Sequence, residues 1–132
     1  MDTLIIAPAR RRDLDAIMEI EQSSFKTPWD MLSLFMALDD PLGWGRVASY
    51  EDRLVGYCFA HAMRDMLHLL NLAVRSGYRR QGIARRLLQE LVDYARQSAR
   101  LFIFLEVRPS NVQAKALYRA MGFEHVCTWR KY

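Results

Sequence analysis

The feature that most constrains the fold is a run of three strand-like segments joined by very short turns. Segments Trp44–Tyr50, Leu54–Met63 and Met66–Val74 are rich in apolar residues, and polar turns at residues 51–52 and 64–65 separate them. Strands joined by such short turns pair antiparallel, because a parallel crossover needs a dozen or more residues. The centre of the chain therefore predicts an antiparallel meander.

Further strand and helix patterns flank this meander. Acidic Asp15, Glu19 and Glu21 lie between the apolar positions of the first helical segment, and the run LFIFLEV suits a strand covered on both faces. The order predicts an α+β layered domain with a mixed, mainly antiparallel sheet, and a single domain over residues 1–132. The predicted flanking elements are strand Thr3–Ala7, helix Asp13–Ser23, helix Met31–Leu38, helix Gly82–Ser98, strand Leu101–Val107, helix Asn111–Met121 and strand Phe123–Trp129.

The composition excludes several classes of protein. Of the 132 residues, 52% are hydrophobic and 26% are charged, which fits a globular chain with a real core and not a disordered one. No run of 18 apolar residues is present, and the first residues do not resemble a secretory signal. Two cysteines, Cys58 and Cys127, cannot form a disulfide scaffold and are expected to pack inside strands, in a reduced, cytoplasmic setting. The sequence has no zinc-ligand spacing, so no metal is expected.

A basic loop with a glycine follows the third strand of the meander. The pattern Arg79-x-x-Gly82-x-Ala84 leads directly into a long helix. The first amides of a helix have no intrahelical partner, and a glycine lets a phosphate approach the backbone. These residues favour an anion site and a plain, solvated strand–helix turn equally. The clustered arginines point to a local anion site more than to a nucleic-acid surface, which stays an alternative: Arg75, Arg79, Arg80, Arg85 and Arg86.

Three further polar residues have a simple structural interpretation. Glu106 interrupts the apolar LFIFLEV run, and an ion pair with Arg108 on the same strand face would offset the cost of burying it. Tyr118 is interpreted as a buried aromatic with a satisfied hydroxyl group, and Asn111 as a helix cap. The histidines show no partner spacing and receive no catalytic role: His61, His68 and His125.

Several motifs together resemble the GNAT superfamily of N-acetyltransferases. The loop matches the R/Q-x-x-G-x-G/A signature of that superfamily. The segments LLNLAV, YRRQGIARRLL, FLEVRPSNVQAKALYRAMGF and RKY look like the bacterial ribosomal-protein-alanine N-acetyltransferases, and SSFKTPW resembles their F-x-x-P-W pattern. The resemblance implies a GNAT-type α/β/α layered fold. Members of the subfamily usually continue into a final strand beyond this region, so that strand is expected to be missing here.

The resemblance also implies an acetyl-CoA-dependent enzyme and its cofactor contacts. The strand before the loop would bind the pantetheine, and the next strand would splay away to leave a slot for the thioester. The loop amides would bind the pyrophosphate, and an amide further along would also contact the cofactor. The implied cofactor-binding residues are Leu72, Ala73 and Val74 on the strand, Arg80, Gln81, Gly82, Ile83, Ala84 and Arg85 in the loop, and Asn111.

The implied catalytic residues are Glu106 as general base and Tyr118 as the acid that protonates the CoA sulfur. Partial burial would raise the pKa of Glu106. The implied acceptor is the N-terminal alanine of a small-subunit ribosomal protein, with no membrane or nucleic-acid partner. Alternatives are a lysine or small-molecule amine as acceptor, or a CoA-binding module without turnover. Phe25 and Trp29 either shape the acceptor pocket or simply pack.

Overall fold

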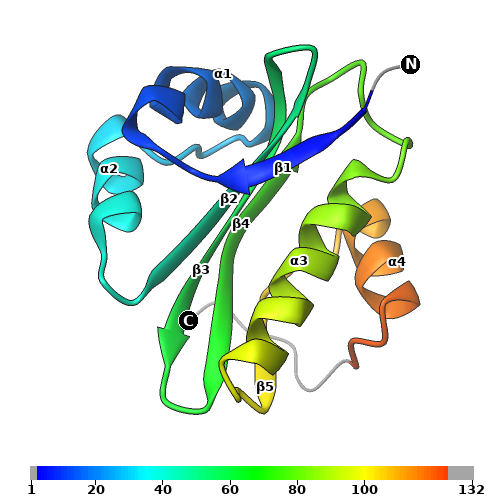
Figure 1. Ribbon diagram of the computed structural model, residues 1–132. Helices are drawn as coiled ribbons and strands as arrows, with labels where there is room; N and C mark the ends of the chain where they lie inside the picture. Colours follow the sequence, from blue (N-terminus) through cyan, green and yellow to red (C-terminus); the bar gives the residue numbers. More distant parts are fainter. Residues whose placement is uncertain (1–2, 125–132) are drawn as a thin grey trace.

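A five-stranded sheet with helices on both faces forms the protein, in a computed structural model that describes residues 3–124 (Figure 1). Helices α1 and α2 cover one face, and α3 and α4 lie on the other. This arrangement confirms the predicted α+β layered fold. In chain order the elements are β1 (Ile5–Pro8), the 3₁₀ turn η1 (Arg11–Asp13), α1 (Leu14–Ser24), α2 (Met31–Asp39), β2 (Gly43–Tyr50), β3 (Arg53–Met63), β4 (Met66–Val74), α3 (Ile83–Gln97), β5 (Phe102–Phe104) and α4 (Val112–Ala120).

The sheet is mixed and mainly antiparallel, as expected. Its strand order is β1-β2-β3-β4-β5, and β5 alone runs parallel to its neighbour among the described strands. Strand β4 is paired with β3 along all of its length, from Met63↔Met66 to Gly56↔Val74. Strand β5 pairs with β4 only from Met66↔Phe102 to His68↔Phe104. The two strands therefore separate after His68, which is the splay that the sequence resemblance implied.

The predictions for the C-terminal third need correction. The strand predicted for Leu101–Val107 is only three residues long, and it is not covered on both faces, since Leu101 is 74% and Phe102 59% exposed. Its apolar run reflects packing on one side only, because Ile103 and Leu105 face the core under α3. Of the strand predicted for Phe123–Trp129, the first two residues are not in a strand, and the rest, with His125 and Cys127, lies outside the described residues.

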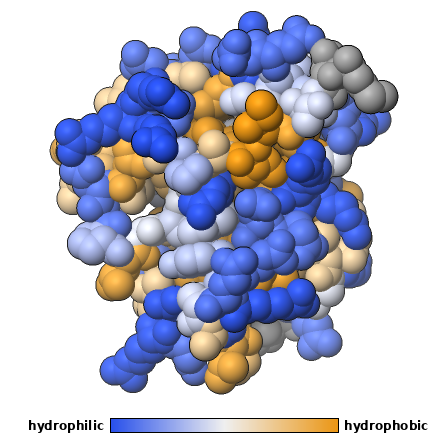
Figure 2. Space-filling model, viewed as in Figure 1, coloured by the Kyte–Doolittle hydropathy of each residue, from blue (hydrophilic) through white to orange (hydrophobic). Residues whose placement is uncertain are grey.

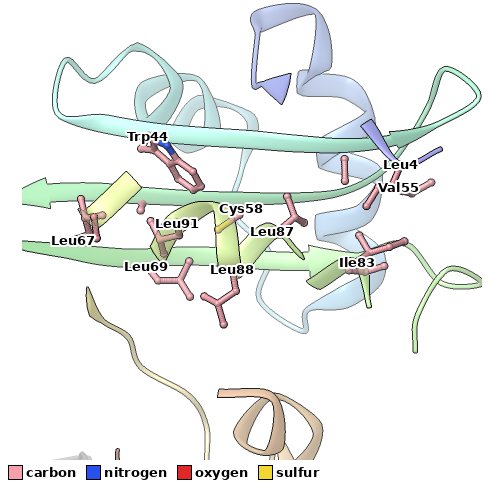
Figure 3. Close-up of a cluster of buried hydrophobic side chains, with 14 of the residues drawn as sticks. Leu4, Trp44, Val55, Cys58, Leu67, Leu69, Ile83, Leu87, Leu88 and Leu91 are labelled. Carbon is pink, nitrogen blue, oxygen red and sulfur yellow. The ribbon is translucent and has the colours of Figure 1, made fainter. Parts of the chain in front are cut away.

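Two hydrophobic cores hold the layers together. One lies between the sheet and α3, where Leu87, Leu88 and Leu91 form an apolar stripe on one side of the helix and are fully buried (Figure 3). Cys58 packs in this core as expected, and burial raises the pKa of its thiol. The other core lies under α1 and α2 and contains these buried residues: Leu14, Ile17, Ile20, Leu34, Val47, Leu54, Tyr57, Phe59 and Ala73.

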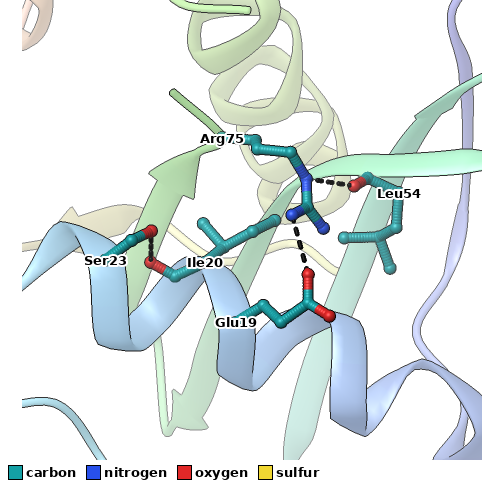
Figure 4. Close-up of polar contacts among 5 residues, drawn as sticks. All are labelled: Glu19, Ile20, Ser23, Leu54 and Arg75. Carbon is teal, nitrogen blue, oxygen red and sulfur yellow. Dashed lines mark hydrogen bonds and ion pairs between the residues drawn. The ribbon is translucent and has the colours of Figure 1, made fainter. Parts of the chain in front are cut away.

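A polar contact fastens α1 to the sheet near the end of β4. The Arg75 guanidinium donates from Nε to the Leu54 carbonyl oxygen at 3.0 Å and from Nη1 to Glu19 Oε1 at 2.9 Å (Figure 4). Figure 2 shows hydrophilic residues over most of one face, interrupted by several apolar patches. None of the helices within residues 3–124 is long and apolar enough to cross a membrane.

Candidate active site

The edge of β4 that faces β5 is open beyond His68. No strand pairing is recorded on that edge for residues 69–74 within the part of the chain that the structure describes. Leu72, Ala73 and Val74 lie here, as the last three residues of β4 before the signature loop, residues 75–82. Unpaired strand amides and carbonyls can bind an extended ligand with its own amide groups, in the manner of an added strand. The geometry therefore fits the amide-bearing pantetheine arm that the sequence resemblance implied.

The loop between β4 and α3 contains three residues in the left-handed region of backbone conformation. Gly77, Arg80 and Gly82 have φ values of +94°, +65° and +82°, and Gly82 is the N-cap of α3. Turns of this kind next to a helix start direct backbone N–H groups to one side and form an anion site. Apart from its chain neighbours, a Cβ at Gly82 would meet no atom within 4 Å, so the space beside this residue is open. The loop thus fits a phosphate ligand, and its exposed members are Arg80, Gln81, Gly82 and Arg85.

The arginine cluster contains two side chains with structural contacts, Arg75 and Arg79, and three others. Arg79 Nε donates to the Val74 carbonyl at 3.0 Å, and its Nη2 donates to Ser24 Oγ at 3.2 Å, so this residue fastens the loop to β4 and α1. The Arg75 side chain is 14% exposed and is paired as described above. The remaining members of the cluster are exposed and can supply positive charge to a bound anion: Arg80, Arg85 and Arg86.

Glu106 follows β5 and faces β4. Its side chain is 53% exposed, and Oε1 lies 3.2 Å from Nε2 of His68, the last β4 residue paired with β5. The His68 ring in turn lies against Phe104, with 5.1 Å between ring centroids. The predicted ion pair with Arg108 is therefore wrong: the partner recorded for the carboxylate is His68. The splay explains this, because a short β5 leaves Glu106 at the open end of the sheet instead of in the strand core.

Helix α4 carries Tyr118 and Asn111. Tyr118 packs against the core under α3 and meets Phe123 edge-on, with 5.8 Å between ring centroids. Burial, with a smaller contribution from Cys58, raises the pKa of Tyr118 to about 12. Its hydroxyl group therefore keeps its proton at neutral pH and can donate it. Asn111 Oδ1 accepts from the Ala114 N–H at 3.1 Å, which confirms the predicted helix cap.

Comparison with known proteins identifies the family to which this arrangement belongs. The family model described as "Acetyltransferase (GNAT) family" matches residues 14–123. The chain belongs to the GNAT family of acetyltransferases. It is accordingly an acetyl-CoA-dependent N-acetyltransferase, as the sequence predicted.

Relatives of this acetyltransferase agree in sequence and in structure. It is 32% identical over 116 residues to a putative [ribosomal protein bS18]-alanine N-acetyltransferase of Bacillus subtilis, which covers 87% of this chain and 77% of the relative. The Escherichia coli K12 enzyme named [ribosomal protein bS18]-alanine N-acetyltransferase is 30% identical over 127 residues, or 96% of this chain and 85% of that protein.

Solved acetyltransferase structures have a similar fold. The crystal structure of the Escherichia coli ribosomal-protein-S18-alanine N-acetyltransferase has a TM-score of 0.88 at 29% identity, and the match covers 96% of this chain and 80% of that one. An aminoglycoside acetyltransferase, in complex with a bisubstrate analogue, has a TM-score of 0.81 at 16% identity over 98% of this chain and 99% of its own. At that identity the likeness concerns the fold alone.

A second polar cluster of the acetyltransferase lies under α1. The Glu21 side chain is 1% exposed and accepts hydrogen bonds from the Tyr57 hydroxyl, from Asn71 Nδ2 at 2.6 Å and from the Trp29 N–H at 2.9 Å. Burial is the main cause that raises the pKa of Tyr57, so its hydroxyl is a donor. Sequence reasoning missed this cluster. The available signal was helical spacing, since Glu21 is four residues after buried Ile17 and falls on the same face of α1.

Proposed function

We propose that this acetyltransferase transfers the acetyl group of acetyl-CoA to a protein N-terminal amine, that of the N-terminal alanine of a small-subunit ribosomal protein. The observation that supports this acceptor is the identity of 30–32% with enzymes named for bS18-alanine acetylation, over 87–96% of this chain. A ribosomal acceptor places the reaction in the cytoplasm. The likeness to aminoglycoside acetyltransferases does not favour a small-molecule acceptor, because it concerns the fold alone.

In the proposed mechanism, acetyl-CoA supplies the thioester whose carbonyl carbon the acceptor amine attacks. The β4 edge at Leu72, Ala73 and Val74 binds the extended arm of the cofactor, and a backbone N–H there stabilises the oxyanion. The amides of residues 80–85 bind the pyrophosphate, and Asn111 adds a contact from the start of α4.

Proton transfer is assigned to the two predicted catalytic residues. Glu106 removes a proton from the acceptor amine through a water molecule, which its half-exposed carboxylate can reach. His68, at 3.2 Å, holds that carboxylate in place. Tyr118 protonates the departing sulfur, for which its raised pKa of about 12 keeps the proton available.

The α-amine acceptor also agrees with the chemistry of a carboxylate base. An α-amino group has a pKa of about 7.7–8.0 and a lysine about 10.4. Near pH 7.5 a sizeable fraction of α-amine is already neutral, whereas only about one lysine in a thousand is. A carboxylate is a weak base, so it completes the deprotonation of an α-amine more easily.

The test compares two peptides of the same composition at pH 7.5. One carries a free N-terminal alanine and the other a blocked N-terminus and an internal lysine. We expect kcat/KM to be higher for the first peptide, with the acetyl group located on the α-amine by fragmentation mass spectrometry. Equal rates, or acetyl on the lysine, would contradict the N-terminal acceptor and leave the acetyltransferase activity standing. If acetyl-CoA binds but no free CoA is released with either peptide, the result would favour a module without turnover.

A further inference from the structure

The buried carboxylate of Glu21 is not used by the proposed chemistry and yet has an unusually complete set of partners. Oε1 accepts from the Tyr57 hydroxyl and from Asn71 Nδ2, and Oε2 accepts from the Trp29 N–H. Every partner is a donor, so both oxygens must act as acceptors at once. An ionised carboxylate does this, whereas a side-chain amide has one oxygen and would turn its own N–H groups toward another donor.

These three bonds join parts of the chain that are far apart in sequence. Trp29 lies in the α1–α2 loop, eight residues from Glu21, and Asn71 lies on β4, fifty residues away. The loop has no regular structure between Phe25 and Asp30. Phe25 and Trp29 pack their partly buried side chains against the core under α1 and α2. A single carboxylate therefore fixes an irregular loop to the sheet.

The β4 end of this connection lies at an irregularity in the strand. Phe59 pairs with Asn71 and the next residue, Ala60, pairs with Leu69, so Leu70 is an extra residue in β4. Bulges of this kind redirect side chains and are frequent beside active sites. Asn71 directly precedes Leu72, the first of the β4 residues assigned to the cofactor. The Glu21 cluster thus lies between the α1–α2 loop and the segment of β4 that is proposed to hold the thioester.

We propose that Glu21 is a positioning residue for the acceptor. Its carboxylate sets the distance between the α1–α2 loop, with Phe25 and Trp29, and the β4 segment that begins at Leu72. This inference rests on the proposed function in that it takes the loop as one wall of the acceptor site. It assigns Glu21 no contact with the cofactor, because its cluster belongs to the α1 face and the signature loop leads into α3 on the other face.

The experiment uses the full chain with Glu21→Gln, which keeps the shape of the side chain but removes an acceptor. We expect KM for the acceptor peptide to rise about tenfold or more, since a buried hydrogen bond to a charged group is lost. KM for acetyl-CoA should stay within about twofold. Hydrogen exchange by mass spectrometry should show faster exchange in residues 25–30, because the Trp29 amide loses its acceptor. Glu19→Gln is the matched control, since Glu19 lies on the same helix and its side chain is 67% exposed. This variant should behave as wild type in all three measurements.

A purely structural role predicts another outcome. Glu21→Gln would then lower the melting temperature with both KM values unchanged, or would raise both KM values together, and either result overturns the proposal. If Glu21→Gln does not fold, Tyr57→Phe decides, because it keeps the ring and the carboxylate and removes one donor. A rise of a few fold in the acceptor KM alone supports the proposal, and an unchanged acceptor KM overturns it.

The proposed function is tested separately, on the wild-type enzyme. If the lysine peptide proves to be the acceptor, the same comparison of KM values is made with that peptide. The hydrogen-exchange result does not depend on which amine is acetylated. Failure of the N-terminal acceptor and failure of the Glu21 proposal are therefore distinguishable.

Discussion

Two glutamates on either side of β4 have opposite environments. Glu21, on the α1 face, is 1% exposed and accepts three hydrogen bonds, whereas the Glu106 side chain is 53% exposed and has His68 as its recorded partner. The sequence suggested the reverse, since Glu106 interrupts an apolar run and Glu21 stands among acidic residues of a helix. A carboxylate that holds structure is enclosed by donors, and one that would exchange a proton is left accessible to water and substrate.

The extent of strand pairing accounts for this contrast. Strand β4 is paired with β3 along all of its length under α1, so the polar groups between the two strands are enclosed and must find partners within the protein. Strands β4 and β5 pair over three residues and then separate, which leaves the residues beyond them open. The following changes at Glu106, Tyr118 and Gly82 test this contrast through their effects on chemistry or cofactor binding.

The largest effect is expected for Glu106→Gln. The amide cannot accept the proton, and a positioned general base typically contributes about 10²–10⁴-fold, so kcat should fall by that factor. The urea midpoint of unfolding should stay that of the wild type, because the side chain is half exposed and its recorded contact is with His68. Steady-state kinetics and equilibrium denaturation make the two measurements. A wild-type rate would remove Glu106 from the chemistry, and a marked loss of stability would remove the contrast with Glu21.

A smaller effect is expected for Tyr118→Phe, about 10²-fold on kcat, at the lower end of the range for acid catalysis. The ring still packs against the core, so the dissociation constant for acetyl-CoA should not change. Should cofactor affinity fall while turnover at saturation holds, Tyr118 would be a binding residue.

The pH dependence of the wild type tests the same hydroxyl group. Because the folded pKa of Tyr118 is about 12, above the ordinary value of 10.0, the group keeps its proton through neutral pH. Kinetics should therefore show no loss of activity from its ionisation below about pH 11. The contribution of the protonated Tyr118 hydroxyl to the stability of the folded state is fully present below pH 10. It is lost as the pH rises through 12.

The smallest effect is expected for Gly82→Val. Gly82 has φ +82°, and a residue with a side chain pays about 1–2 kcal/mol to adopt the left-handed region. If the loop shifts to avoid this strain, affinity for acetyl-CoA should fall about tenfold, which calorimetry measures. Gly122→Val is the matched control, since Gly122 has φ +97° and open space around it but lies after α4. Unchanged affinity in Gly82→Val would remove the loop from the cofactor site.

Local signals predicted the helices and the meander to within one or two residues. Asn111 caps α4 as predicted, and Asp30 caps α2, where its Oδ1 accepts from the Ser33 N–H at 2.8 Å. Helix α3 buries residues at helical spacing, which the sequence shows directly: Ile83, Leu87, Leu88, Leu91 and Ala95. The predicted helix start at Asp13 was one residue early, because its carboxylate accepts from the Arg10 N–H and closes the 3₁₀ turn before α1.

The sequence by itself determined the order of the elements up to α4, the cap of α4 and the buried stripe of α3, because these depend on residues within one or two turns of each other. Tertiary structure decided how far β5 follows β4, and with it the exposure of Glu106. It also decided the contacts of His68 with Glu106 and of Glu21 with Asn71, which are 38 and 50 residues apart in sequence. Such partners are selected by strand register and layer packing, and a histidine or a glutamate has the same local pattern with or without them.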